Sequence, residues 1–158
     1  MKLEVPLPTR RQTIRLGRAL ASCLSAGDLV ILDGPLGSGK TFLVRATCRA
    51  LGLPASERVT SPTFTLVHEI PVHPPIAHAD LYRLTAPEEV AQLGLDALRA
   101  EGHALLVEWG APYQSLLGGD ALLISLSITP ERSAQIAASG RRSGQALEEL
   151  RESLRRGS

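Results

Sequence analysis

The feature that most constrains the fold of this 158-residue chain is a glycine-rich segment at residues 34–41, Gly-Pro-Leu-Gly-Ser-Gly-Lys-Thr. It matches the pattern G-x-x-x-x-G-K-[ST], in which a loop between a strand and a helix binds phosphate groups. Residues 28–33 before it form a short, mostly apolar run, as a strand buried on both faces does. Residues 41–51 after it have helical periodicity and stop at Gly52. The segment therefore predicts a strand, a phosphate-binding loop (P-loop) and a helix in direct succession.

Each residue type in this loop meets a need of a bound triphosphate. Gly34, Gly37 and Gly39 lack the Cβ atom that would keep backbone N–H donors away from phosphate oxygens. Lys40 places a positive charge at the β and γ phosphates, which makes it a candidate catalytic residue, and the Thr41 hydroxyl suits Mg²⁺. We therefore expect ATP or ADP and Mg²⁺ as cofactors. The expected cofactor-binding residues here are Gly34, Pro35, Leu36, Gly37, Ser38, Gly39, Lys40, Thr41 and Phe42.

Hydrophobic periodicity and turn residues divide the rest of the chain into further helices and strands. Thr9 with Gln12, and Thr85 with Glu88, have the spacing of helix capping boxes. Helices are expected over residues 9–24, from 85 to 94 or in broken form to 102, and over 144–156; strands are expected within 59–69, at 76–80, and over 103–108, 121–128 and 133–138.

This alternation predicts an α/β fold, specifically a P-loop NTPase-like domain with three layers, α/β/α. The sheet is expected to be mixed and mainly parallel, with antiparallel strands toward the C-terminus because tight turns join the last strands. The chain is long enough for one domain with its own core. Residues 1–140 would form the P-loop ATPase domain, and residues 141–158 a C-terminal helix or tail of the same domain.

The composition is that of an ordinary globular protein, with 44% hydrophobic residues, 21% charged residues and a formal net charge of +1. This charge gives no reason to expect tight, non-specific binding to nucleic acid or to a membrane. The sequence shows neither an apolar run of about 18 residues nor a signal peptide, so we expect a cytoplasmic protein. Cys23 and Cys48 lie on apolar helical faces without CxxC spacing, and are expected to be reduced, inert core thiols.

A P-loop needs a second acidic group near Mg²⁺, usually at the end of a neighbouring apolar strand. Glu108 ends Ala-Leu-Leu-Val and could bind Mg²⁺, directly or through water, or orient the attacking water. Asp80 ends Ile-Ala-His-Ala and could do the same work, or it could only cap a turn.

Two further parts of the sequence each leave two interpretations open, and for a third one interpretation is favoured. Ser61-Pro62-Thr63 is either a switch that senses the γ-phosphate or a turn that enters a strand. Trp109 either covers the nucleotide site or fills the core. His78 is expected to make one structural hydrogen bond rather than to bind metal.

In four segments the chain resembles the TsaE (YjeE) family of bacterial ATPases, which assist threonylcarbamoyladenosine modification of tRNA. These segments are GPLGSGKT at 34–41, SPTFTLV at 61–67, HADLYRL at 78–84 followed by PEEVAQLGL, and VEWG at 107–110. The resemblance covers residues 7–140. The chain departs from the family pattern at Phe42, where a second Thr usually stands.

The resemblance implies that Thr41 and Glu108 bind Mg²⁺, that Asp80 and Thr63 support hydrolysis, and that Trp109 lies near the nucleotide. It also implies that Thr9 and Arg132 lie near the nucleotide. The expected partners are TsaB and the catalytic subunit TsaD, with tRNA contacted indirectly through the complex and with no stable homo-oligomer required. The expected activity is ATP hydrolysis, weak in the isolated chain and stimulated by the partners.

Two other functions fit a P-loop in a chain of this length. A small nucleoside or metabolite kinase would need an Arg-rich lid and an acceptor site, and Arg141 and Arg142 are adjacent. A nucleotide-switched adaptor would bind ATP without hydrolysing it.

Overall fold

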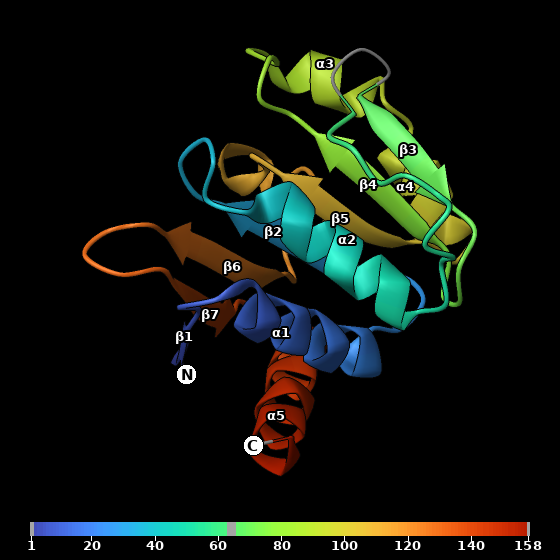
Figure 1. Ribbon diagram of the computed structural model, residues 1–158. Coiled ribbons are helices and arrows are strands. Elements are labelled where there is room, and N and C mark those ends of the chain that lie inside the picture. The colour runs from blue at the N-terminus through green and yellow to red at the C-terminus, as the bar shows by residue number, and fades with distance from the viewer. Residues whose placement is uncertain (1, 63–65, 158) are drawn as a thin grey trace.

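Seven strands of the described residues, 2–62 and 66–157, form one mixed sheet in the computed structural model (Figure 1). The strands are β1 (Lys2–Pro6), β2 (Leu29–Asp33), β3 (Val67–Ile70), β4 (Ile76–Asp80), β5 (Ala104–Glu108), β6 (Leu122–Ser127) and β7 (Ser133–Ala138), in the sheet order β1-β7-β6-β2-β5-β4-β3. The helices are α1 (Arg10–Cys23), α2 (Lys40–Ala50), α3 (Pro87–Ala91), α4 (Leu95–Ala100), the 3₁₀ helix η1 (Ala111–Tyr113) and α5 (Arg141–Arg156).

The four central strands, β6, β2, β5 and β4, are parallel, whereas both edges of the sheet are antiparallel. The predicted antiparallel strands toward the C-terminus are present as β6 and β7. The expectation of a mainly parallel sheet holds only for this centre, because β3 and β4 also form a hairpin. The Pro-rich turn at 71–75 that joins them is too short for a parallel crossover.

Strand β1, which pairs antiparallel with β7, is not among the strands expected from the sequence. Its residues do alternate, since Val5 is buried and its neighbours Glu4 and Pro6 are exposed. This alternation of buried and exposed residues is too short to predict a strand. The segment becomes a strand of the sheet only by pairing with β7, which lies more than 120 residues away in the sequence. Strand β1 brings the chain to Thr9, the N-cap of α1, whose hydroxyl lies 3.4 Å from the Gln12 nitrogen as predicted.

Apolar residues of β2 alternate between two faces of the sheet. Val30 and Leu32 join a core cluster with α1, α2 and α5, and Leu29 and Ile31 join a second cluster with α3 and α4. The two clusters explain why β2 is apolar at nearly every position, as a strand covered on both faces should be. Burial raises the pKa of the Cys23 and Cys48 thiols, both in the first cluster, to about 12, so both stay protonated at neutral pH as expected.

Two helix starts differ from the sequence prediction. The capping box of α3 lies one residue later than expected, because Glu89 Oε1, not Glu88, accepts from the backbone nitrogens of Thr85 and Ala86 at 3.2 and 3.1 Å. Of the two forms predicted for this helix, the broken one is present, as α3 and α4 with Gly94 as the N-cap of α4. Helix α5 begins at Arg141 rather than 144, and Asp120 accepts from the backbone nitrogens of its first turn, those of Arg142 and Ser143.

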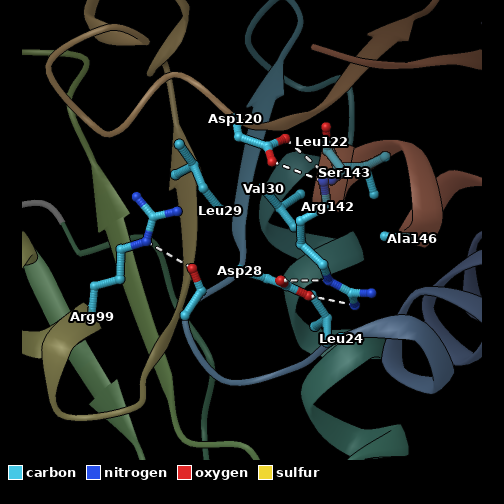
Figure 2. A pocket seen from close by; sticks show the side chains of 11 residues that line it. Leu24, Asp28, Leu29, Val30, Arg99, Asp120, Leu122, Arg142, Ser143 and Ala146 are labelled. Carbon is cyan, nitrogen blue, oxygen red and sulfur yellow. Dashed lines mark hydrogen bonds and ion pairs between the residues drawn. The ribbon is translucent and has the colours of Figure 1, made fainter. Parts of the chain in front are cut away.

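Arg142 connects the start of α5 to the amino end of β2, as Figure 2 shows. Its Nε and Nη2 atoms each lie 3.0 Å from a carboxylate oxygen of Asp28, which is 8% exposed. Arg99 donates to the Gly27 carbonyl at 2.7 Å on the other side of the same pocket. The cavity that remains has a volume of about 30 Å³, enough for about one water molecule. We therefore interpret this cluster as structural.

The Asp120 cap predicts a pH-dependent contribution to stability. Hydrogen bonds from Ser143 and Arg142 lower the pKa of Asp120 from 3.8. A lowered pKa means that this contribution is full above the unfolded-state value near pH 4 and is lost as the pH falls through the folded-state value. We expect Asp120→Ala to lower the unfolding free energy by about 1 kcal/mol at pH 7, and Asp120→Asn to be nearly neutral there because Asn is an equally good cap.

Urea unfolding of the wild type, Asp120→Ala and Asp120→Asn at pH 7 and pH 3 measures this contribution. The wild type should lose more stability on acidification than Asp120→Asn. Equal losses in the two proteins would contradict a role for the carboxylate charge.

No helix among residues 2–62 and 66–157 is both long enough and apolar enough to cross a membrane.

Candidate nucleotide site

The glycine-rich loop lies where predicted, between the carboxyl end of β2 and the first turn of α2. A Cβ atom on Gly34 would lie 2.6 Å from both the Leu126 carbonyl oxygen and the Ser38 hydroxyl, so no other residue fits there. Gly39, the N-cap of α2, has a φ of 103°, which side chains rarely allow. The Ser38 hydroxyl is buried without a hydrogen-bond partner among the described residues. The loop thus keeps a tight backbone cradle at the positive end of a helix, which suits an anion.

Lys40 is buried in this cradle, with 5% of the residue exposed. Its Nζ atom donates to the carbonyl oxygens of Gly34 and Pro35, the latter at 3.1 Å, and lies 4.1 Å from the centre of the Trp109 ring. Burial lowers the pKa of Lys40, while the charges of Glu108, Asp80 and Asp33 oppose that shift. The ammonium group is therefore costly to bury and is surrounded by acceptors.

Glu108, at the end of β5, contacts the start of α2. Its Oε2 atom accepts from the Thr41 hydroxyl at 2.9 Å and lies 2.6 Å from His78 Nε2. Both Glu108 and His78 are almost completely buried, with 3% and 0% exposed. The hydroxyl and carboxylate oxygens form a hard donor set of the kind that Mg²⁺ prefers. The structure therefore brings together the two residues that the sequence predicted as metal ligands, and they fit the ion.

Asp80 lies next to Glu108, because parallel pairing of β4 and β5 sets these two residues opposite each other. The Ser61 hydroxyl donates to one carboxylate oxygen of Asp80, and the Tyr82 nitrogen donates to the other at 3.0 Å. Asp80 thus caps the turn after β4 and also faces the loop that contains Ser61. A role of Asp80 beside the Mg²⁺ position and a role as the cap of a turn are therefore compatible in the structure.

Trp109 follows Glu108 directly and has a φ of 62°, unusual for a bulky residue. Its ring packs against Tyr82, with ring centres 4.9 Å apart, and is half-buried. Strained backbone of this kind costs about 1–3 kcal/mol and is concentrated at functional sites. The conformation directs the indole over Lys40, so Trp109 lines the site and also packs against the second core cluster.

Two cavities flank the loop. One, of about 310 Å³, contains the predicted metal ligands and both acidic candidates; its lining includes Lys40, Thr41, Ser61, Asp80, Glu108 and Trp109. The other, of about 340 Å³, contains Thr9 and Arg132, which the resemblance had placed near the nucleotide. Arg132 Nη1 lies 3.4 Å from the Ser38 carbonyl oxygen. Gly39 and Phe42 line both cavities. The predicted site residues in the two cavities therefore lie on either side of the same part of the loop. Thr63 lies outside the described residues.

Two contacts of this site are not predicted by the sequence. The sequence pattern predicts Ser61 only as part of a turn or switch, and His78 only with an unspecified structural hydrogen bond. The bond of His78 is to Glu108, and its Nδ1 atom is buried without a partner among the residues described. The available signal was the spacing of His78 and Asp80, since residues two apart on a strand face the same side.

Comparison of the sequence with known proteins identifies a matching family. The family model described as "Threonylcarbamoyl adenosine biosynthesis protein TsaE" matches residues 7–136. A tRNA threonylcarbamoyladenosine biosynthesis protein TsaE from Streptomyces coelicolor is 44% identical over 99 residues, which are 60% of this chain and 65% of that protein. One of the same name from Rickettsia felis is 33% identical over 126 residues, 79% of this chain and 72% of that protein.

The fold has a counterpart among solved structures. The crystal structure of YdiB from a Bacillus superposes with a TM-score of 0.81 at 26% identity, covering 96% of this chain and 95% of that one. The similarity therefore extends beyond the matched motifs to almost the whole chain, α5 included.

Proposed function

Because the chain belongs to the TsaE family of threonylcarbamoyl adenosine biosynthesis proteins, we propose that it is a P-loop NTPase-like enzyme that binds and hydrolyses Mg-ATP. Family membership supports a role in tRNA threonylcarbamoyladenosine biosynthesis. Hydrolysis would serve the modification of an adenosine next to the anticodon. The protein would act with TsaB and TsaD, and would contact tRNA only through that complex.

The observation that carries this proposal is the contact between Thr41 and Glu108, whose oxygens lie 2.9 Å apart beside the P-loop. They come from α2 and β5, and a purely structural loop does not need both. When bound there, Mg²⁺ would neutralise charge on the phosphate oxygens. Thr41 and Glu108 would hold the ion, and His78 would keep the Glu108 carboxylate in its orientation.

The remaining site residues would divide the work of binding and hydrolysis. Loop N–H groups and Lys40 would bind the phosphates, and Trp109 would exclude water above Lys40. Asp80, held by Ser61 and by the Tyr82 nitrogen, would orient the attacking water. Thr63 would assist it, as the resemblance implies. Thr9, Phe42 and Arg132 would contact the part of the nucleotide on the other side of the loop.

ATPase assays with and without TsaB–TsaD test the proposal. We expect low activity for the isolated chain and clear stimulation by the two partners. If neither ATP hydrolysis nor tRNA modification responds when the components are combined, the chain has the fold of the family without this function.

The adjacent Arg141 and Arg142 at the start of α5 are the candidate lid arginines of the kinase alternative. A lid arginine must reach the phosphates, but Arg142 binds Asp28, at the end of β2 opposite the P-loop. We therefore expect no transfer of labelled γ-phosphate from ATP to nucleosides, and robust transfer would favour a kinase. A nucleotide-switched adaptor would instead bind ATP and the partners without the partner-stimulated release of phosphate.

A further inference from the structure

Positive charge is concentrated on helices α1 and α2, which lie side by side on one face of the sheet (Figure 1). The two helices contain no Asp or Glu and seven cationic residues: Arg10, Arg11, Arg15, Arg18, Lys40, Arg45 and Arg49. The whole chain has 17 basic and 16 acidic residues, which leaves ten basic against 16 acidic elsewhere, a formal charge of −6. The near-zero net charge therefore hides an uneven distribution. Because Lys40 is buried at the P-loop, the six arginines supply the charge that would attract an anionic partner.

A groove with an apolar floor runs between these helices. We call it the α1–α2 groove; it has a volume of about 290 Å³ and is lined by Ile14 and Arg18 of α1 and by Phe42, Arg45 and Arg49 of α2, among others. Ile14 is 37% exposed, and the Arg45 guanidinium carbon lies 6.0 Å from the centre of the Phe42 ring. The groove thus combines an exposed apolar surface with three arginines around it.

None of these three arginines forms an ion pair within the described part of the chain. Arg45 donates to the Val59 carbonyl at 3.1 Å, and Arg49 donates to the carbonyls of Pro54 and Glu57. Carbonyl acceptors position a guanidinium without neutralising its charge. Arg18 is exposed. All three charges therefore remain uncompensated for an incoming carboxylate.

We propose that the α1–α2 groove docks an amphipathic segment of a protein partner, with apolar side chains on Ile14 and Phe42 and Asp or Glu side chains on the arginines. This proposal rests on the proposed function, in which the partner is the TsaB–TsaD complex. The apolar floor favours a protein over RNA, because a phosphodiester backbone has nothing to bury there. The long terminal helix α5 of a second copy would fit poorly, since it has five basic and three acidic residues.

The position of Phe42 connects this groove to the nucleotide site. Phe42 lines the groove and both cavities beside the P-loop, and it follows Thr41 directly. A partner side chain packed on the Phe42 ring would restrict the first turn of α2, on which Thr41 lies. Docking in the groove would thereby account for stimulation of hydrolysis by the partners.

Charge reversal at Arg18 tests the proposal, with Arg141→Glu as the matched control on an exposed arginine of α5. We expect Arg18→Glu to weaken binding to TsaB–TsaD roughly tenfold, equivalent to about 1.4 kcal/mol, and to reduce its salt dependence. Basal ATP hydrolysis should be unchanged, because Arg18 lies outside the nucleotide cavities. Arg141→Glu should bind like the wild type.

A photo-crosslinking amino acid at Ile14 identifies the occupant. The same group at Leu116, an exposed residue next in sequence to Leu117 of the opposite core cluster, is the control. The expected product joins Ile14 to an Asp- or Glu-rich peptide of TsaB or TsaD, and the Leu116 position gives none.

Three results would overturn the proposal. Binding of Arg18→Glu with wild-type affinity would exclude the groove while leaving the proposed function intact. Crosslinks to this chain itself, or Arg18-dependent binding of tRNA alone, would identify a different occupant. If the wild type does not bind TsaB–TsaD, both the docking proposal for the α1–α2 groove and the proposed partners are wrong.

Discussion

Replacing Lys40 with alanine is expected to lower kcat/KM for ATP hydrolysis by about three orders of magnitude, through loss of the charge that we propose stabilises the β and γ phosphates. Lys40 is held in the cradle by the Gly34 and Pro35 carbonyls and lies under Trp109. Among the residues that the structure describes, no other cationic side chain lines the cavity that contains Thr41 and Glu108. The loss should therefore not be compensated within the chain.

The stability of Lys40→Ala should not fall together with its activity, which separates a catalytic effect from unfolding. Burial lowers the pKa of Lys40, so the folded state destabilises its charge relative to water. Removing that charge should leave the thermal midpoint equal to or above that of the wild type. A variant that loses both activity and stability would indicate a structural role instead.

The chain offers an internal control, because Lys2 is its only other lysine. An acyl-phosphate derivative of ATP, which acylates lysines near the γ-phosphate, should modify Lys40 and spare Lys2, and excess ATP should protect Lys40. Lys2→Ala should hydrolyse ATP like the wild type. Equal labelling of both lysines would contradict binding of the triphosphate at the loop.

The local part of the site could be predicted from the sequence because the loop leaves few options. Residues 34–41 require a strand before and a helix after, and the structure has both in β2 and α2. The carboxylates were found as Asp80 and Glu108 because each ends an apolar run. The residues alone allow either carboxylate to bind Mg²⁺ or to orient water, and only the resemblance assigns Mg²⁺ to Glu108. Which carboxylate contacts Thr41 depends on strand order. Only the placement of β5 beside β2, with β4 outside it, sets Glu108 against α2.

Contacts between distant segments were out of reach for the same reason. Strand β1 has a short alternating pattern that becomes recognisable only beside β7. The bond from Ser61 to Asp80 joins a loop to the end of β4, and nothing in the local pattern of either residue requires it. The uneven distribution of charge was present in the sequence, but it became a surface only when α1 packed against α2.

Glu108→Gln is expected to lower kcat by a factor of about 10² to 10³, because the amide keeps the size of the side chain but removes its charge from the Mg²⁺ position. The amide can still accept from Thr41, so the folded structure should be retained. Binding of ADP separates this effect from general damage. The wild type should bind ADP more tightly with Mg²⁺ than with EDTA, and in Glu108→Gln this difference should shrink toward zero.

Isothermal titration of ADP into the wild type, Glu108→Gln and Asp80→Asn, each with Mg²⁺ and with EDTA, distinguishes the two carboxylates. Glu101→Gln, on an exposed carboxylate after α4, is the matched control and should behave like the wild type. We expect Asp80→Asn to keep the Mg²⁺-dependent difference and to lose hydrolysis, because Asp80 contacts Ser61 and the Tyr82 nitrogen rather than Thr41. If Asp80→Asn abolished the Mg²⁺ dependence and Glu108→Gln preserved it, the metal would belong to β4. The contact of Glu108 with His78 and Thr41 would then serve only to hold β4, β5 and α2 together.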